Sequence, residues 1–462
     1  MKNKNIYLIA LAILYNLLFY NLKLGINVIL FNIPFLIFLI YYLLKNDLVK
    51  NKNGLLFLIP IIILSMNYFI YNNFYSRINK FIIPLFYIIM IIYTVNPPKT
   101  ITNFITKIFS EIIKPFDYIE EVQKELKEYE NKLSKESKTI IQIIKSTIII
   151  LPIVIIVLLL LTSADSLFDN ILGETLSLIF KMLRPTFIMR ILSILFFFFY
   201  ISLSLIYIKK DLTIEEDEEK EDNKSNITVK LLLTVLNIIY IIFDLIQIHS
   251  LFLHNIDSSF NYADYARRGF FQLMIISFIN FSIILFSKSK KDSYVKIMSI
   301  IILILTGIII CSSFYRMFLY EQAYGYTILR LGVYVILVTE MILIIPTILY
   351  VLKENINILN YYVIIITGVY TIINLFSVDN IITNNNIKRY YKINKIDIYY
   401  LENNNYDNIP LLISLKKQCS DNYLKDEIDF YLKERYQEIK KEKIVEKSLS
   451  SNYAESLLKQ KK

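Results

Sequence analysis

The stretch NYADYARRGFFQLMIISFINFSIILF (Asn261–Phe286) joins a charged, tyrosine-rich segment directly to an apolar one. The apolar part, which starts at Phe270, is long enough to cross a bilayer as a helix. Similar apolar runs recur along the 462-residue chain, of which 55% is hydrophobic. A soluble domain could not bury so much apolar surface, so the composition predicts a multi-span membrane protein.

The apolar runs predict about eleven transmembrane helices, because a lipid-exposed strand would leave backbone groups unpaired. They lie at Ile6–Leu22, Gly25–Leu44, Gly54–Tyr71, Phe81–Val95, Ile141–Thr162, Phe187–Ile208, Val229–Phe252, Phe270–Ser287, Lys296–Phe314, Arg330–Leu352 and Tyr361–Ser377. The expected fold class is therefore all-α: a polytopic membrane helical bundle with a small helical C-terminal domain.

The chain divides by composition into four expected parts. Residues 1–95 form a four-span segment, 96–140 a charged cytoplasmic helical arm, 141–377 a seven-span membrane domain and 378–462 an extracytoplasmic helical tail. The arm interleaves Glu and Lys at helical spacing, which favours a solvated helix and leaves a partner-binding coiled coil open.

The tail is expected to end in a long charged helix over roughly Asp421–Lys447, with Ser420 or Asp421 as its N-cap. Its apolar positions fall on one stripe, which predicts the face that packs: Leu424, Ile428, Leu432 and Ile439.

Lysine placement predicts the orientation of the chain in a cytoplasmic membrane. With Lys2 and Lys4 inside, the inside segments carry Lys45, Lys50, Lys52, the stretch Lys99–Lys138, Lys209, Lys210, Lys288, Lys290 and Lys291. The opposite loops carry fewer, so the positive-inside rule places the N-terminus inside. An odd number of spans then places the tail outside.

The sequence lacks the motifs of several classes of enzyme and cofactor-binding protein. The eight Gly form no phosphate-binding loop, and two His with two Cys cannot supply a four-ligand zinc site alone. No Ser lies in G-x-S-x-G. We therefore expect no cofactor and no metal, and assign no catalytic residue. In a membrane protein, lysine placement that gives a net charge of +10 reflects the orientation of the spans, so we expect no nucleic-acid partner.

Polar residues at membrane depth are the first candidates for a site. Asn237, Tyr240, Asp244 and Gln247 follow one another at steps of three, four and three, and so share one helical face. An ionised Asp in lipid costs at least ~2.5–3.5 kcal/mol, which predicts that this face looks into the bundle. Glu340 is a second intramembrane acid. These residues are either a proton or cation site or a polar stripe that bonds neighbouring helices.

The predicted outer loops carry a second candidate site. Several Tyr in these loops suit the headgroup layer. The charged residues beside them are Asp264, Arg267, Arg268, Arg316, Glu321 and Arg330. We expect a carboxylate–guanidinium contact between Tyr262–Gly269 and Tyr315–Arg330. These charges either form ion pairs between loops or line a cleft that binds an anionic headgroup or a partner, since guanidinium matches phosphate.

The words YADYARRGFFQL and YRMFLYEQAYGYTILRL, with SADSLFDNI, NIKRYYKINKIDIYYL and YDNIPLL, resemble the bacterial membrane family catalogued as Domain of Unknown Function 4173. The resemblance covers roughly Thr147 to Leu415. It implies a multi-span helical fold in a bacterial membrane, and it implies no catalytic residues.

Three functions stay open from the sequence. The chain is a non-enzymatic sensor, scaffold or ligand-binding protein of the bacterial envelope, a secondary transporter that uses Asp244 and Glu340, or a membrane-embedded transferase acting on a lipid-linked substrate. The transferase would need a deep outer pocket that joins His254, Asp165 and Arg316. The expected partners are the lipid bilayer and either an anionic lipid or an envelope protein.

Overall fold

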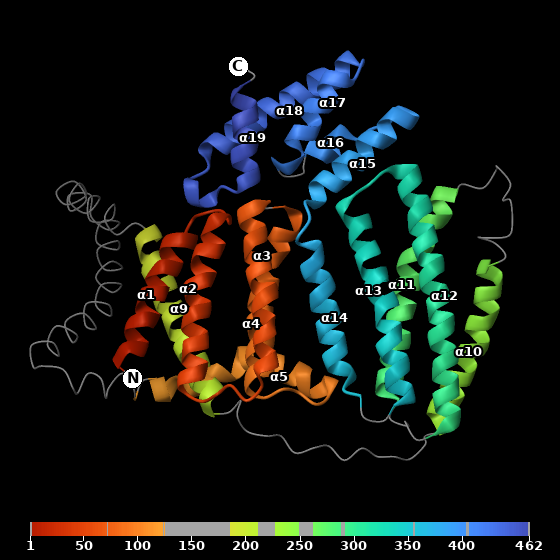
Figure 1. Ribbon diagram of the computed structural model, residues 1–462, viewed down its shortest axis with the longest axis horizontal. Coiled ribbons are helices and arrows are strands. Elements are labelled where there is room, and N and C mark those ends of the chain that lie inside the picture. The colour runs from red at the N-terminus through yellow and green to blue at the C-terminus, as the bar shows by residue number, and fades with distance from the viewer. Residues whose placement is uncertain are drawn as a thin grey trace, which may run out of the picture.

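The computed structural model describes residues 2–71, 73–122, 124, 185–210, 227–248, 262–287, 292–353, 356–402 and 406–460. Helices make up this part of the chain, and it contains no strand. The upright helices in Figure 1 stand side by side: α1 (Lys2–Phe19), α2 (Ile26–Lys45), α3 (Leu58–Ile70), α4 (Phe74–Val95), α9 (Pro185–Lys210), α10 (Ile227–Ile248), α11 (Tyr262–Phe286), α12 (Ser293–Tyr324), α13 (Ile328–Leu352) and α14 (Ile358–Ile373). The all-α fold class is confirmed.

The count of about eleven spans is not confirmed. In the described residues, seven helices are long and apolar enough to cross a membrane, and an eighth if α14 and α15 (Val378–Ile393), bent by 62°, form one span. The apolar parts of α1 and α11 are shorter than the others, at Lys4–Phe19 and Phe270–Leu285. The predicted span Ile141–Thr162 lies outside the described residues.

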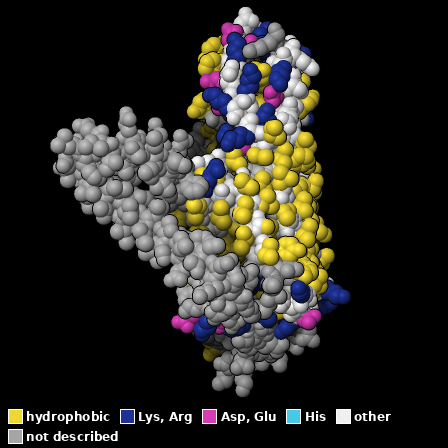
Figure 2. All heavy atoms as spheres, turned by 90° about the vertical axis from the view of Figure 1, so that its left-hand side faces the viewer, with side chains coloured by type: hydrophobic (Ala, Val, Ile, Leu, Met, Phe, Trp, Pro, Cys, Tyr) yellow, Lys and Arg dark blue, Asp and Glu magenta, His cyan; other side chains and the backbone are white. Residues whose placement is uncertain are grey.

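The surface of the bundle has the banded pattern of a membrane protein. Figure 2 shows a broad belt of hydrophobic side chains, with charged side chains gathered above and below it. Large apolar side chains on α10 and α13, elsewhere on the bundle, are also exposed, among them Leu245 and Ile345. Such side chains are favourable only where lipid covers them.

Two apolar cores divide the bundle into halves. The first half consists of α1–α4 and α9, and α9 is tied to α2 where the Tyr42 hydroxyl donates to the Leu205 carbonyl at 2.9 Å. The second half consists of α10–α13. Helix α14 lies between them and packs on both α3 and α13 (Figure 1). The division of the chain into four sequence domains stays a prediction.

A short amphipathic helix, α5 (Ile101–Ile113), lies across the lower end of the bundle (Figure 1). Thr100 caps it, because its hydroxyl accepts the Asn103 amide at 3.2 Å. One face exposes Ile105, Phe109 and Ile112. Apolar side chains on a helix in this position suit the membrane interface. The helix continues into η2 (Lys114–Tyr118), and most of the predicted charged arm beyond it is outside the described residues.

The C-terminal domain sits on the upper end of the bundle, opposite the N-terminus (Figure 1). It contains α15, α16 (Ile398–Glu402), η4 (Tyr406–Asn408), α17 (Ile409–Gln418), α18 (Asn422–Lys441), η5 (Ile444–Glu446) and α19 (Leu449–Lys459). Asp421 caps α18 by accepting the Tyr423 amide at 2.9 Å, as predicted. The predicted stripe of α18 is buried. The helix ends at Lys441, where Glu442 turns to extended backbone, rather than at Lys447.

Candidate functional site

The polar face of α10 is buried against α11 and α12. Asn237 donates to the Met298 carbonyl at 3.0 Å, and the Tyr240 hydroxyl donates to the Asn280 side chain at 2.8 Å. Asn280 in turn donates to the Thr306 hydroxyl at 2.9 Å. The helical spacing noted in the sequence therefore produces a row of hydrogen-bonded side chains between α10, α11 and α12.

Asp244 lies on the same face of α10 with its carboxylate buried. The residue is 2% exposed, and neither carboxylate oxygen has a hydrogen-bond partner among the described residues. Three residues further along α10, Gln247 accepts hydrogen bonds from the Ser312 hydroxyl at 3.0 Å and from Arg316 at 2.7 Å. A buried carboxylate without hydrogen bonds is costly, and such a group at membrane depth marks a candidate site.

Glu340 approaches the same half of the bundle from α13. It is 6% exposed, and the Ser277 hydroxyl of α11 donates to its Oε2 at 2.6 Å. The two intramembrane acids therefore lie on different helices, α10 and α13, within one four-helix unit. Glu340 has the hydrogen-bond donor that Asp244 lacks.

The predicted outer site is described only in part. The side chains of Asp264, Arg267 and Arg268 lie outside the described residues, as do Asp165 and His254. The expected ion pair between Tyr262–Gly269 and Tyr315–Arg330 therefore stays a prediction.

Phe270, the residue that follows the first of these segments, contacts α12. Phe270 at the start of the apolar part of α11 stacks on Tyr320 of α12, with ring centroids 6.1 Å apart. The Ser313 hydroxyl also donates to the Phe270 carbonyl at 2.9 Å.

The described charges of the outer site point into the protein. Arg316 is 6% exposed and bonds Gln247. Glu321 is also buried and accepts the Tyr334 hydroxyl at 3.0 Å. Arg330 lies 4.3 Å above the Tyr320 ring and donates to the Gly325 carbonyl. Glu321 and Arg330 thus join the upper ends of α12 and α13, while Arg316 joins α12 to α10. Sequence spacing alone did not reveal these roles.

The loop between α12 and α13 is bound by the C-terminal domain. Arg389 of α15 donates to the Gln322 carbonyl at 3.2 Å and the Ala323 carbonyl at 2.6 Å. Asn386 accepts from the Tyr326 amide at 3.0 Å and donates to its carbonyl at 2.8 Å. The Ile328 amide donates to the Tyr400 hydroxyl at 2.7 Å. We call this set of interactions the loop contact.

Gly325 is required at the centre of the loop contact. Its φ of +85° lies in the region that side chains avoid, and a Cβ there would lie 2.7 Å from the Asn386 side chain. The words YEQAYGYTILR and NIKRYYKINKIDIYYL, which drew attention in the sequence, therefore bind each other. No local signal could reveal this pairing, because some 60 to 70 residues separate the partners.

The C-terminal domain also binds the first half of the bundle. The Lys23 amide donates to Glu446 at 3.0 Å, and the Ser450 hydroxyl donates to the Tyr71 carbonyl at 2.9 Å. At Gly25 the backbones are so close that a Cβ would lie 2.2 Å from the Glu446 carbonyl oxygen. We call this set the N-terminal contact.

A buried acid lies at the junction of α14 with the C-terminal domain. Asp407 is 4% exposed and accepts the Ser377 hydroxyl at 2.7 Å. Burial raises the pKa of Asp407 to about 7, and the hydrogen bond from Ser377 partly offsets this effect. No group of three or more His, Cys, Asp or Glu in the described part of the chain could hold a metal ion.

These features define a polytopic α-helical membrane protein whose C-terminal helical domain is docked on its bundle. The chain belongs to the family described as Domain of unknown function (DUF4153), whose model matches residues 58–415. The resemblance to Domain of Unknown Function 4173 thus named a different family, although both are domains of unknown function. The match starts at 58 rather than near Thr147, so it includes α3 and α4. Neither the curated proteins nor the solved structures contain a match.

Proposed function

We propose that the protein is a non-enzymatic sensor or scaffold of the bacterial cytoplasmic membrane, in which the C-terminal domain couples the two halves of the bundle. The observation that carries this proposal is the pair of docking contacts. One joins the domain to the second half at Gln322–Ile328, and the other joins it to the first half at Lys23–Gly25 and Tyr71. A rigid domain fixed at both points would transmit a shift of either half to the other.

The chemistry of the contacts suits coupling rather than catalysis. Most of their hydrogen bonds end on backbone carbonyls or amides, which fixes the position of the chain and leaves no reactive group to turn over a substrate. Coupling between two sites needs an element whose arrangement both sites bias. The domain formed by α15–α19 meets that need, because one apolar core joins its helices to one another and also contains Tyr75 of α4.

Amide hydrogen exchange of the full chain in detergent tests the coupling. Arg389→Ala removes the guanidinium from the loop contact, and Lys392→Ala removes an exposed cation one turn away on the same helix. We expect Arg389→Ala to speed exchange at the loop contact and also at Lys23–Gly25, while Lys392→Ala changes neither. Faster exchange confined to the loop contact would contradict the proposal.

For orientation we propose the N-terminus inside and residues 378–462 outside. The lysine asymmetry supports this, and so do the opposite positions of the N-terminus and the C-terminal domain in Figure 1. Cys419 is buried and cannot report it by labelling. Ile444 is 83% exposed. We therefore expect Ile444→Cys to react with an impermeant maleimide in intact spheroplasts. Protection until the membrane is opened would reverse the assignment.

A second candidate function is a secondary transporter that uses Asp244 and Glu340. The buried carboxylate of Asp244, which has no hydrogen-bond partner among the described residues, favours a transporter, since intramembrane acids of this kind occur in proton relays. In proteoliposomes, this function requires a proton flux that Asp244→Asn abolishes in a normally folded protein. Equal flux in the two proteins would exclude a role for Asp244 in proton transfer.

A further inference from the structure

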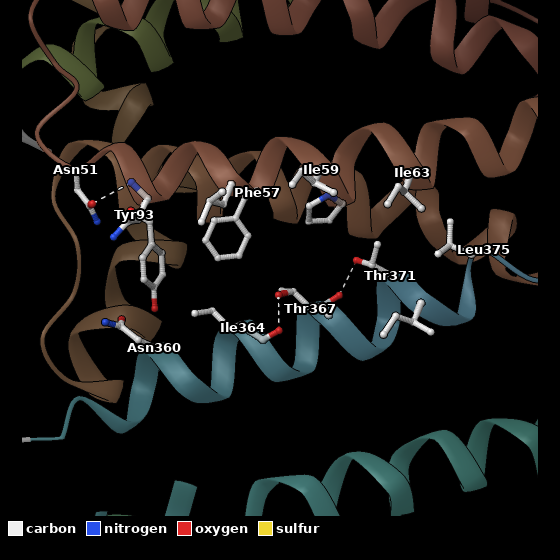
Figure 3. Close-up of a pocket in the computed structure, with 15 residues that line it drawn as sticks. Asn51, Phe57, Ile59, Ile63, Tyr93, Asn360, Ile364, Thr367, Thr371 and Leu375 are labelled. Atoms are coloured by element: carbon white, nitrogen blue, oxygen red, sulfur yellow. Dashed lines mark hydrogen bonds between the residues drawn. The ribbon is translucent and has the colours of Figure 1, made fainter.

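A long groove lies on the side of the bundle where η1 (Lys52–Phe57) and α3 face α14. Its volume is about 580 Å³, and it extends along α14 from Asn360 to Leu375 (Figure 3). Ile59 and Ile63 line one wall, and Ile364 and Leu375 lie on the other. The groove therefore runs parallel to the spans, and most of its length is apolar.

Even the polar residues in the middle of the groove present apolar atoms to it. The Thr367 hydroxyl donates to the Val363 carbonyl at 2.6 Å, and the Thr371 hydroxyl donates to the Thr367 carbonyl at 2.6 Å, as Figure 3 shows in part. Both hydroxyls are thus satisfied by the backbone of their own helix. At Gly368 the groove is open, because a Cβ there would meet no atom within 4 Å.

The lower end of the groove is polar. Asn51, Asn53, Tyr93 and Asn360 line it, and Figure 3 shows Tyr93 pointing towards Asn360. Tyr93 is 6% exposed, yet neither its hydroxyl nor the side-chain oxygen of Asn360 has a hydrogen-bond partner among the described residues. Buried polar groups normally have partners, so a donor and an acceptor left over at one end of a groove point to a ligand.

The length and the position of the groove favour an acyl chain as its occupant. At about 1.5 Å per residue, Asn360 to Leu375 spans about 22 Å, and most of this length is apolar and parallel to the spans. A lipid matches a long apolar groove that ends in polar groups, because one molecule carries both an extended hydrocarbon chain and a polar head.

We propose that this groove binds one anionic glycerophospholipid, with an acyl chain along α14 and the head group at the Tyr93–Asn360 end. The Tyr93 hydroxyl donates to an ester or phosphate oxygen, and Asn360 accepts from a head-group hydroxyl. The exposed Lys52 beside Asn51 supplies the positive charge for the phosphate. This end of the groove lies at the same end of the bundle as the interfacial helix α5 (Figure 1), where lipid head groups gather.

Gly368 allows a variant that fills the groove without harming the fold. Gly368→Phe adds a side chain whose Cβ meets no atom within 4 Å, and it improves helix propensity, since Gly is the poorest helix former after Pro. Ile366→Phe is the matched control, because Ile366 is 48% exposed on α14 and does not line the groove. Equal melting temperatures of the three proteins would show that any loss of lipid is local.

Native mass spectrometry of the purified full chain, titrated with dioleoyl phosphatidylglycerol or the matched phosphatidylcholine, tests the proposal. We expect one phosphatidylglycerol per chain in the wild type and in Ile366→Phe, and at least tenfold weaker retention in Gly368→Phe. Lys52→Gln should reduce the preference for phosphatidylglycerol over phosphatidylcholine. Equal retention by all variants, or a chain dimer that Gly368→Phe dissociates, would overturn the proposal. Equal binding of both lipids by the wild type would overturn the head-group assignment.

Discussion

The bundle contains two groups of buried polar side chains that differ in chemistry. Where α3, α4 and α14 meet, the group consists of amides and hydroxyls: Asn67 donates to the Asn374 carbonyl at 2.8 Å, and Asn79 donates to the Asn374 side chain at 2.8 Å. In α10–α13 the group includes the carboxylates of Asp244 and Glu340.

The difference indicates which group serves the fold. Neutral groups that hydrogen-bond one another stabilise helix contacts at little cost, so a structural role accounts for the asparagine group. A buried carboxylate without hydrogen bonds costs free energy, so a structural role does not account for Asp244. The following predictions test this contrast.

The largest effect is expected from Asn79→Leu. Asn79 also accepts the Tyr370 hydroxyl at 2.7 Å, so the substitution removes the acceptor of the Tyr370 hydroxyl and the donor to the Asn374 side-chain oxygen. Each buried group left unpaired costs about 1–3 kcal/mol. Thermal unfolding in detergent should show a clear loss of stability. Phe81→Leu, at a side chain that is 69% exposed, is the control and should have little effect. If Asn79→Leu is equally harmless, the asparagine group is not structural.

Asp407 should make the docking of the C-terminal domain depend on pH. Its pKa of about 7 in the folded protein exceeds the usual value of about 3.9 for an unfolded chain, so the folded state binds more protons between these values. The stabilising contribution of its protonated form is complete below about pH 4 and is lost as pH rises through about 7.

The measurement is the melting temperature of the wild type minus that of Asp407→Asn, between pH 4 and 8. We expect this difference to decline with rising pH and to level off above about pH 7. The exposed Asp426 provides the control substitution Asp426→Asn. A difference that stays flat, or that rises with pH, would show that Asp407 is not held as a buried acid.

The smallest effect on stability is expected from Asp244→Asn. The amide removes the cost of a buried charge and keeps a group of the same shape, so the melting temperature should stay the same or rise slightly. Glu340→Gln should behave alike, because Ser277 can still donate to the amide oxygen. Loss of about 2 kcal/mol or more in Asp244→Asn would show an unrecognised structural bond, since leaving a buried group unpaired costs about 1–3 kcal/mol.

The sequence predicted those features that depend on local pattern. The step of three, four and three on α10 located a buried face, the stripe on α18 was predicted residue by residue, and Asp421 is one of the two N-caps that were predicted. These succeed because helical periodicity and capping involve residues close in the chain.

Features that depend on distant pairing were not predictable. The bonds from Arg389 to the loop before α13, and from Glu446 to Lys23, join residues separated by 66 and 423 positions. The sequence left Arg316, Glu321 and Arg330 open as ion pairs between loops or as part of an anion-binding cleft, and only the fold shows which neighbouring helices and rings the three side chains contact. The count of about eleven spans stays a prediction, because seven or eight helices meet the length and hydropathy test in the described residues and the predicted span Ile141–Thr162 lies outside them.

The central claim is that the C-terminal domain couples the two halves, and a double-mutant cycle between the docking contacts tests it most directly. Gly25→Ala pushes Glu446 away from the first half, and Arg389→Ala weakens the loop contact. The free energy of opening of α19, from hydrogen exchange, is measured for both single variants and the double variant. The account predicts that the opening free energy of α19 falls less in the double variant than the sum of its decreases in the two single variants. The difference should be at least about 0.5 kcal/mol, because either change already weakens both contacts. Losses that add within about 0.3–0.5 kcal/mol would mean that the contacts are independent, and would contradict the account.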